Sequence, residues 1–181
     1  MRSLVIRRWN DLREALTTLP DVRTWLACAL VYALFLFVAA PIGLTSGLLR
    51  PTSPHLSVAD ALWASLLMLI HPALVEEMVF RGLLLPRNPR TTSRTLLVAI
   101  AAAALALYVA SHPLNAWLFR PDVLGVFASP AYLVLAALLG LACTVAYFIS
   151  RSIWPPVAIH WLTVMLWIWF LGGQALLGSR R

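Results

Sequence analysis

Apolar residues form five long runs along this chain, separated by short segments rich in arginine, proline and serine. The runs cover residues 25–44, 61–85, 96–110, 131–149 and 153–171. A helix needs about 20 consecutive apolar residues to cross the hydrocarbon core of a bilayer, and each run is near that length. The pattern predicts an all-α, polytopic membrane protein with about five transmembrane helices, of which the third is the shortest.

The first 20 residues instead interleave apolar and basic positions. Apolar side chains recur at the spacing of one helical face, at Val5, Trp9, Leu12, Leu16 and Leu19. With arginines between them, this is typical of an amphipathic helix on a membrane surface. Pro20 should end the helix, and Asp21 can cap the next one. We expect residues 1–20 to lie on the cytoplasmic surface.

Composition agrees with a membrane setting. The chain is 61% hydrophobic and 12% charged, whereas soluble domains average about 25% charged residues. We therefore expect residues 1–181 to form a single integral membrane domain. The net charge of +7 comes entirely from arginine. Because these arginines lie in short loops and tails, anionic lipid headgroups and membrane topology explain them better than a nucleic-acid partner does.

The arginines also predict an orientation. With five spans and the N-terminus inside, the cytoplasmic arginines are Arg2, Arg7, Arg8, Arg13, Arg23, Arg87, Arg90, Arg94 and Arg151. Those outside are Arg50, Arg120, Arg180 and Arg181. Since cytoplasmic loops carry the excess of basic residues, the N-terminus should be cytoplasmic. We expect an integral protein of the bacterial inner (cell) membrane.

Three charged residues interrupt the second apolar run, at Glu76, Glu77 and Arg81. Unpaired, they would cost about 8–10 kcal/mol to insert, whereas the apolar residues of the run return about 6 kcal/mol. Glu77 and Arg81 are four residues apart and can form an ion pair on one helical face. Glu76 is rotated by about 100° and has no such partner, so it can accept a proton from water. Alternatively, all three groups form a structural polar cluster.

Histidines on two other runs could complete a site for water activation. Tyr108 and His112 share a helical face at the end of the third run, where Pro113 should halt the helix. His160 lies about a turn and a half after the prolines that open the fifth run. A carboxylate and two imidazoles can supply a base, an orienting group and a stabiliser of an oxyanion.

The remaining histidines and the cysteines have simpler explanations. We expect His71 to bond a neighbouring helix and Pro72 to kink the second span just before the carboxylates. His55 lies in a proline- and serine-rich loop and should be at the surface. Cys28 and Cys143 lie within apolar runs and are interpreted as small packing residues.

These motifs carry a family resemblance. Glu76-Glu77-x-x-x-Arg81, Tyr108-x-x-x-His112 and His160 resemble the three ordered motifs of the CPBP superfamily, the CAAX-processing and bacteriocin-processing membrane proteases. The resemblance covers residues 61–171, which would be a protease-like core. It implies a glutamic intramembrane endopeptidase without a cofactor, in which Glu76 activates the water.

The resemblance also implies roles for the other positions. His112 would orient the water or shuttle protons, and His160 would stabilise the oxyanion. Glu77 and Arg81 would be supporting residues, as their spacing already indicates. Tyr108 stands where the family pattern has phenylalanine, and its extra hydroxyl lies near His112.

One departure concerns the oxyanion site. Val164 stands four residues after His160, where the family has Asn or Asp, and losing one oxyanion donor costs about 10²–10³ in rate. Thr163 or Asn115 could substitute, and the sequence leaves both open. The chain could also be an inactive member of the family.

The implied substrate is a membrane-tethered protein or peptide, prenylated or not, and tail processing of exported proteins is one possibility. Two rival functions stay open. One is a non-enzymatic membrane scaffold or bacteriocin-immunity protein. The other is a zinc-dependent metalloprotease, because Glu76, Glu77, His112 and His160 are residue types that ligate zinc; no His-Glu-x-x-His motif is present.

Overall fold

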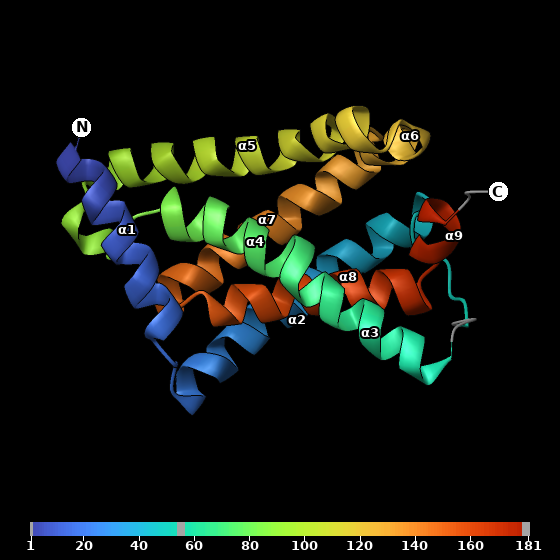
Figure 1. Ribbon diagram of the computed structural model, residues 1–181, viewed down its shortest axis with the longest axis horizontal. Helices are drawn as coiled ribbons and strands as arrows, with labels where there is room; N and C mark the ends of the chain where they lie inside the picture. Colours follow the sequence, from blue (N-terminus) through green and yellow to red (C-terminus); the bar gives the residue numbers. More distant parts are fainter. Residues whose placement is uncertain (1, 54–56, 179–181) are drawn as a thin grey trace.

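The computed structural model describes residues 2–53 and 57–178, with the side chains of residues 6–53 and 57–178. All regular structure within these ranges is helical (Figure 1). The long helices are α1 (Arg2–Thr17), α2 (Val22–Thr45), α3 (Val58–Met68), α5 (Arg94–Phe119), α7 (Pro130–Ser150) and α8 (Trp154–Phe170). The short segments are η1 (Leu69–Leu74), α4 (Val75–Glu77), η2 (Met78–Leu83), η3 (Pro89–Thr91), η4 (Pro121–Val123), α6 (Leu124–Phe127) and α9 (Gly173–Leu177). The predictions that involve His55 and the side chains of Arg2, Val5, Arg180 and Arg181 fall outside what is described.

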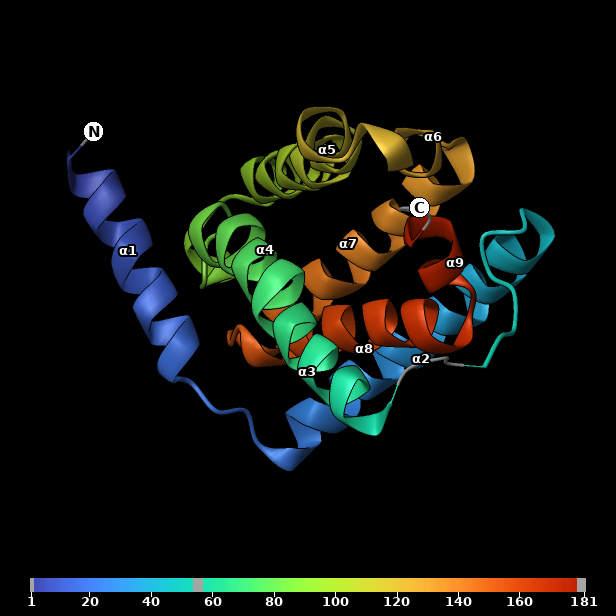
Figure 2. The same cartoon turned by 45° about the vertical axis from the view of Figure 1, so that its right-hand side comes forward.

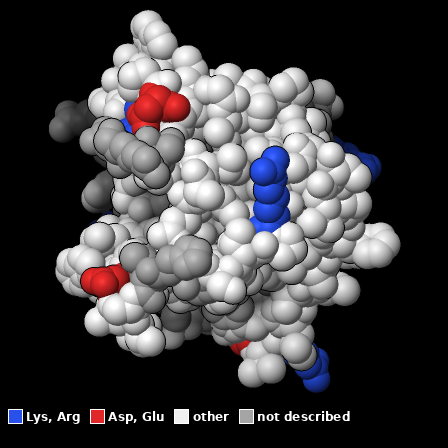
Figure 3. Space-filling model, turned by 90° about the vertical axis from the view of Figure 1, so that its right-hand side faces the viewer, with Lys and Arg blue, Asp and Glu red and all other residues white. Residues whose placement is uncertain are grey.

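The described residues contain four helical stretches that are long and apolar enough to cross a membrane. They are Val22–Thr45, Val58–Leu83, Arg94–Phe119 and Pro130–Ser150. The fifth apolar run forms α8, which is shorter at 17 residues. Large apolar side chains such as Phe37 and Trp117 are exposed, as on surfaces that meet lipid. Charged side chains are sparse on the end of the molecule drawn in Figure 3. The predicted polytopic helical membrane fold is confirmed.

The third apolar run forms α5, and two predictions about it are wrong. We expected the shortest span, halted at Pro113, but α5 has 26 residues and contains Pro113. Prolines are more frequent inside membrane helices than inside soluble ones, so Pro113 need not end this span. Just before Pro113, the Ser111 hydroxyl and the His112 ring both bond the Tyr108 carbonyl, at 2.7 and 2.9 Å. His112 therefore lies well inside a helix.

The second span bends just before its carboxylates, as predicted. His71 has extended angles, φ −136° and ψ 118°, and the His71–Pro72 peptide is cis. Beyond the bend, η1, α4 and η2 continue to Leu83. The indole nitrogens of Trp161 and Trp169 bond the Ser65 carbonyl and hydroxyl, at 2.8 and 3.2 Å, and hold α3 against α8. Within the described chain the exposed His71 ring has no hydrogen bond to a neighbouring helix, which corrects that expectation.

Helix α7 is the centre of the bundle and packs against α2, α5 and α8 (Figure 2). Gly140 lets α5 approach closely, because a Cβ there would lie 2.6 Å from the Leu105 Cδ1 and 2.8 Å from the Tyr108 Cδ1. Cys28 and Cys143 are free thiols in the buried cluster between α2 and α7. Their predicted role as packing residues is confirmed.

Helix α1 packs beside η2 at the outer edge of the bundle (Figures 1 and 2). Leu12 is 2% exposed and lies against Gly82, where any Cβ would collide with the leucine side chain. The other predicted apolar positions differ from Leu12, because Trp9 is exposed and Leu19 is 82% exposed beyond the end of the helix. Part of that face thus serves to dock α1 on the bundle.

Hydrogen bonds hold the end of α1 to the turn between α7 and α8. The Ser152 hydroxyl donates to the Thr18 carbonyl at 2.7 Å, and the Trp154 indole donates to the Leu16 carbonyl at 3.0 Å. After the turn at Pro20, the Asp21 carboxylate accepts from the Thr24 amide at 2.8 Å. The predicted cap of α2 is confirmed.

Because α1 docks through Leu12, replacing Leu12 should destabilise the protein more than replacing Leu19. Leu12→Ala should lower stability by about 2–5 kcal/mol, the usual cost of removing a buried leucine side chain, whereas Leu19→Ala should leave it nearly unchanged. Thermal unfolding of both purified variants in the same detergent measures this. Equal melting temperatures for the two variants would show that α1 does not pack as described.

Candidate active site

A buried ion pair lies at the centre of the site. The Arg81 Nη1 donates to the Glu77 Oε1 at 2.9 Å, and both side chains are buried. The second guanidinium nitrogen of Arg81 donates to the Gly140 carbonyl of α7 at 2.8 Å. The ion pair expected from the four-residue spacing is present, and it also connects η2 to α7.

His160 of α8 joins the same carboxylate. Its Nδ1 lies 2.9 Å from the Glu77 Oε1. Because an ionised carboxylate can only accept, this nitrogen carries the proton and donates. The Nε2 of a neutral ring is then an acceptor, and it lies 4.0 Å from the Glu76 Oε2. Glu77 thus fixes both the orientation of the ring and the nitrogen that faces Glu76.

Glu76 is held differently from its neighbour. Its side chain is 16% exposed, and its Oε2 is buried without a hydrogen-bond partner. The 4.0 Å between this oxygen and the His160 Nε2 is too long for a direct hydrogen bond and suits two groups that share one water molecule. The Glu77 Oε2 is also buried without a partner, but the Glu77 Oε1 accepts two hydrogen bonds, whereas Glu76 accepts none from the described residues.

Tyr108 and His112 approach this group from α5. The Tyr108 ring centroid lies 4.8 Å from that of His112 and 6.1 Å from that of His160. The Arg81 guanidinium carbon lies 4.5 Å from the centre of the same ring, in cation–π geometry. The His112 Nδ1 donates to the Tyr108 carbonyl, which leaves its Nε2 as an acceptor. Residues from three spans thus meet at one place.

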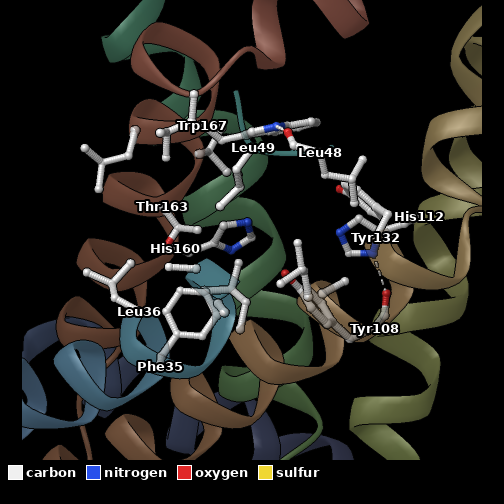
Figure 4. Close-up of a pocket in the computed structure, with 18 residues that line it drawn as sticks. Phe35, Leu36, Leu48, Leu49, Tyr108, His112, Tyr132, His160, Thr163 and Trp167 are labelled. Atoms are coloured by element: carbon white, nitrogen blue, oxygen red, sulfur yellow. Dashed lines mark hydrogen bonds between the residues drawn. The ribbon is translucent and has the colours of Figure 1, made fainter. Parts of the chain in front are cut away.

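The two histidines border a single pocket of about 160 Å³. Figure 4 shows the His112 and His160 rings on opposite sides of it. Its walls come from α2, α5, α7, α8 and residues 48–49, and apolar side chains make up most of them. Such a pocket can hold an apolar segment with a few polar groups placed to act on it.

Two predicted supporting residues are not placed as we expected. Asn115 is exposed on α5 and is not part of the pocket wall. Thr163 does line the pocket, but its hydroxyl donates to the Ile159 carbonyl at 2.8 Å. Val164 also lines the pocket and brings no donor.

Sequence reasoning missed two contributors to the pocket. The Tyr132 ring packs against His112 with centroids 5.6 Å apart, and Gly140 supplies the carbonyl that binds Arg81. The sequence offered one signal for Tyr132, a tyrosine early in an apolar run. It offered none for Gly140, because this residue acts through its backbone carbonyl.

Among the described residues, no group of three or more His, Cys, Asp and Glu side chains is arranged to hold a metal ion.

Comparison with known proteins gives one match. A family model described as type II CAAX prenyl endopeptidase Rce1-like matches residues 58–166, more than half of the chain. This region contains Glu76, Glu77, Arg81, Tyr108, His112 and His160. Curated proteins and solved structures gave no match.

The ion pair generates a stability prediction. Arg81→Ala should lower stability by about 3–5 kcal/mol, since it leaves the Glu77 carboxylate buried without its cation. Arg120→Ala is the matched control, because Arg120 pairs with Asp122 at 2.7 Å but is far more exposed, and exposed pairs contribute little. Thermal unfolding in detergent checks this, and similar losses in both variants would contradict it.

Proposed function

The chain belongs to the type II CAAX prenyl endopeptidase Rce1-like family, and on that premise we propose that it is a glutamic-type intramembrane endopeptidase. As a family member it is a CAAX-type endopeptidase of the membrane that acts on a protein or peptide. The finer proposal is that Glu76 activates the attacking water. The observation that carries it is the unpartnered Glu76 oxygen 4.0 Å from the His160 Nε2.

In the proposed mechanism, the ionised Glu76 accepts a proton from water as the water oxygen attacks the scissile carbonyl carbon. The carbonyl oxygen becomes an oxyanion. The carbonyl then reforms as the C–N bond breaks, and the protonated Glu76 gives its proton to the leaving amine. Glu76 ends the cycle ionised, so no further reactant is required.

The other residues act around this step. His112, with its Nδ1 committed to a carbonyl, presents Nε2 to the pocket and orients the water. In this proposal His160 acts as the doubly protonated imidazolium: its Nδ1–H donates to Glu77, which holds the ring, and its Nε2–H donates to the reacting oxygen. Arg81 holds the Glu77 carboxylate in place through a 2.9 Å contact, and the proposal assigns the proton exchange to Glu76.

The substrate that fits is a membrane-tethered protein or peptide. The apolar pocket between α2, α5, α7 and α8 suits an apolar segment or a lipid chain attached next to the cleaved bond. We include the apolar C-terminal tail of an exported protein as a candidate beside a prenylated C-terminus. We also propose that residues 1–181 form one membrane domain of the bacterial inner membrane with a cytoplasmic N-terminus.

The proposal predicts that Glu76→Gln abolishes cleavage while leaving expression and melting temperature nearly unchanged, because Glu76 accepts no hydrogen bond from the described residues and approaches the His160 Nε2 only at 4.0 Å. The assay should use full-length protein in lipid nanodiscs, with farnesylated peptides and tail-anchored reporters as two substrate sets. Glu14→Gln, at the exposed carboxylate that pairs with Arg87, is the control and should keep wild-type turnover. Retained turnover in Glu76→Gln would contradict the glutamic mechanism. No cleavage by the wild-type protein, with biological activity intact in Glu76→Gln, would favour the scaffold or immunity alternative.

The zinc alternative is tested separately. A glutamic mechanism predicts full activity after dialysis against a strong chelator, and no stoichiometric zinc in the purified active protein. The measurements are turnover before and after chelation and elemental analysis. Loss of activity that added zinc restores would instead support a metalloprotease.

A further inference from the structure

The pocket wall contains a phenol that the network described above leaves without a partner. Tyr108 is 1% exposed and lines the pocket, and its hydroxyl is buried with no hydrogen bond. Buried hydroxyl groups are bonded in the large majority of cases, because an unsatisfied one costs about 1–3 kcal/mol. A donor left open beside a pocket is available to a ligand that enters it.

Packing fixes the direction of this phenol. Its ring lies between the two histidine rings, with Arg81 over its face. Phe80 packs edge-on against it at 5.2 Å, and Gly140 of α7 leaves room for it. Figure 4 shows the Tyr108 side chain reaching from α5 into the pocket between His112 and His160.

Two other pocket side chains close to His160 in sequence offer no open donor. Val164, one turn after His160, is apolar, and the Thr163 hydroxyl is bonded to its own helix. Tyr132 lines the pocket but packs against His112 and Trp167. Within the described part of the chain, Tyr108 is the pocket tyrosine whose ring contacts both histidines.

We propose that the Tyr108 hydroxyl is an oxyanion donor of this enzyme, acting with His160 on the carbonyl oxygen of the scissile bond. This inference rests on the proposed function. As water attacks, the carbonyl π electrons move to that oxygen, and the phenol donates a hydrogen bond to it while keeping its proton. A phenol carries its proton at neutral pH and is able to donate. The hydroxyl would thus supply the donor that Val164 cannot.

Two tyrosine variants test this in the full-length protein. Tyr108→Phe should lower kcat by about 10²–10³, the usual effect of losing one oxyanion donor, with little change in KM. Its melting temperature should stay equal or rise, because the variant removes an unsatisfied polar atom. Tyr147→Phe is the matched control: its hydroxyl is also buried and unpartnered, but it lies outside the pocket. It should keep wild-type kcat.

Each alternative result overturns a different statement. Full kcat in Tyr108→Phe, with Glu76→Gln inactive, overturns the oxyanion role and leaves the proposed function standing. Turnover in Glu76→Gln overturns the proposed function itself. A Tyr108→Phe protein that fails to fold, or melts as low as Arg81→Ala, shows that the hydroxyl is structural and also overturns the inference.

Discussion

The buried contact between Glu77 and Arg81 is the interaction on which the rest of the site depends. Two charges inside a bilayer are costly unless they are paired and hydrogen-bonded. Arg81 uses Glu77 and the Gly140 carbonyl, and Glu77 uses Arg81 and His160. One ion pair therefore connects the second span to both α7 and α8.

This arrangement gives two adjacent glutamates unlike chemistry. The Glu77 Oε1 accepts from a guanidinium and an imidazole, which fixes this carboxylate in place. Glu76 points elsewhere on the same turn, is partly exposed, and accepts no hydrogen bond from the described residues. The division follows from helix geometry: adjacent residues differ by about 100° in direction, so one arginine four residues on can pair with only one of them.

Much of the fold and part of the site could be predicted from the sequence. The apolar runs, the kink at Pro72, the cap at Asp21 and the Glu77–Arg81 pair depend on spacing along one helix, which sequence records directly. The course of α5 through Pro113 could not be predicted, because a proline can end a membrane helix or lie inside one, and the sequence does not decide between the two. The docking of α1 depends on Gly82, whose lack of a side chain leaves room for Leu12. This contact joins segments that are distant in the sequence.

The candidate oxyanion donor could not be predicted from the sequence either. Thr163 and Asn115 were reasonable from residue type, but a threonine hydroxyl in a helix often bonds its own backbone, as Thr163 does here. Tyr108 looked like a neutral replacement for phenylalanine, because sequence cannot reveal that a hydroxyl is buried without a partner. Only the placement of α5 against α7 and α8 brings that group to the pocket.

A structure of the Glu76→Gln variant with an uncleaved substrate peptide tests the central claim most directly. The account predicts that the scissile carbonyl carbon faces residue 76 and that the carbonyl oxygen lies within hydrogen-bonding distance of the His160 Nε2 and the Tyr108 hydroxyl. A substrate bound in full occupancy with its scissile bond outside this pocket, for example against the outer face near His71, would contradict it.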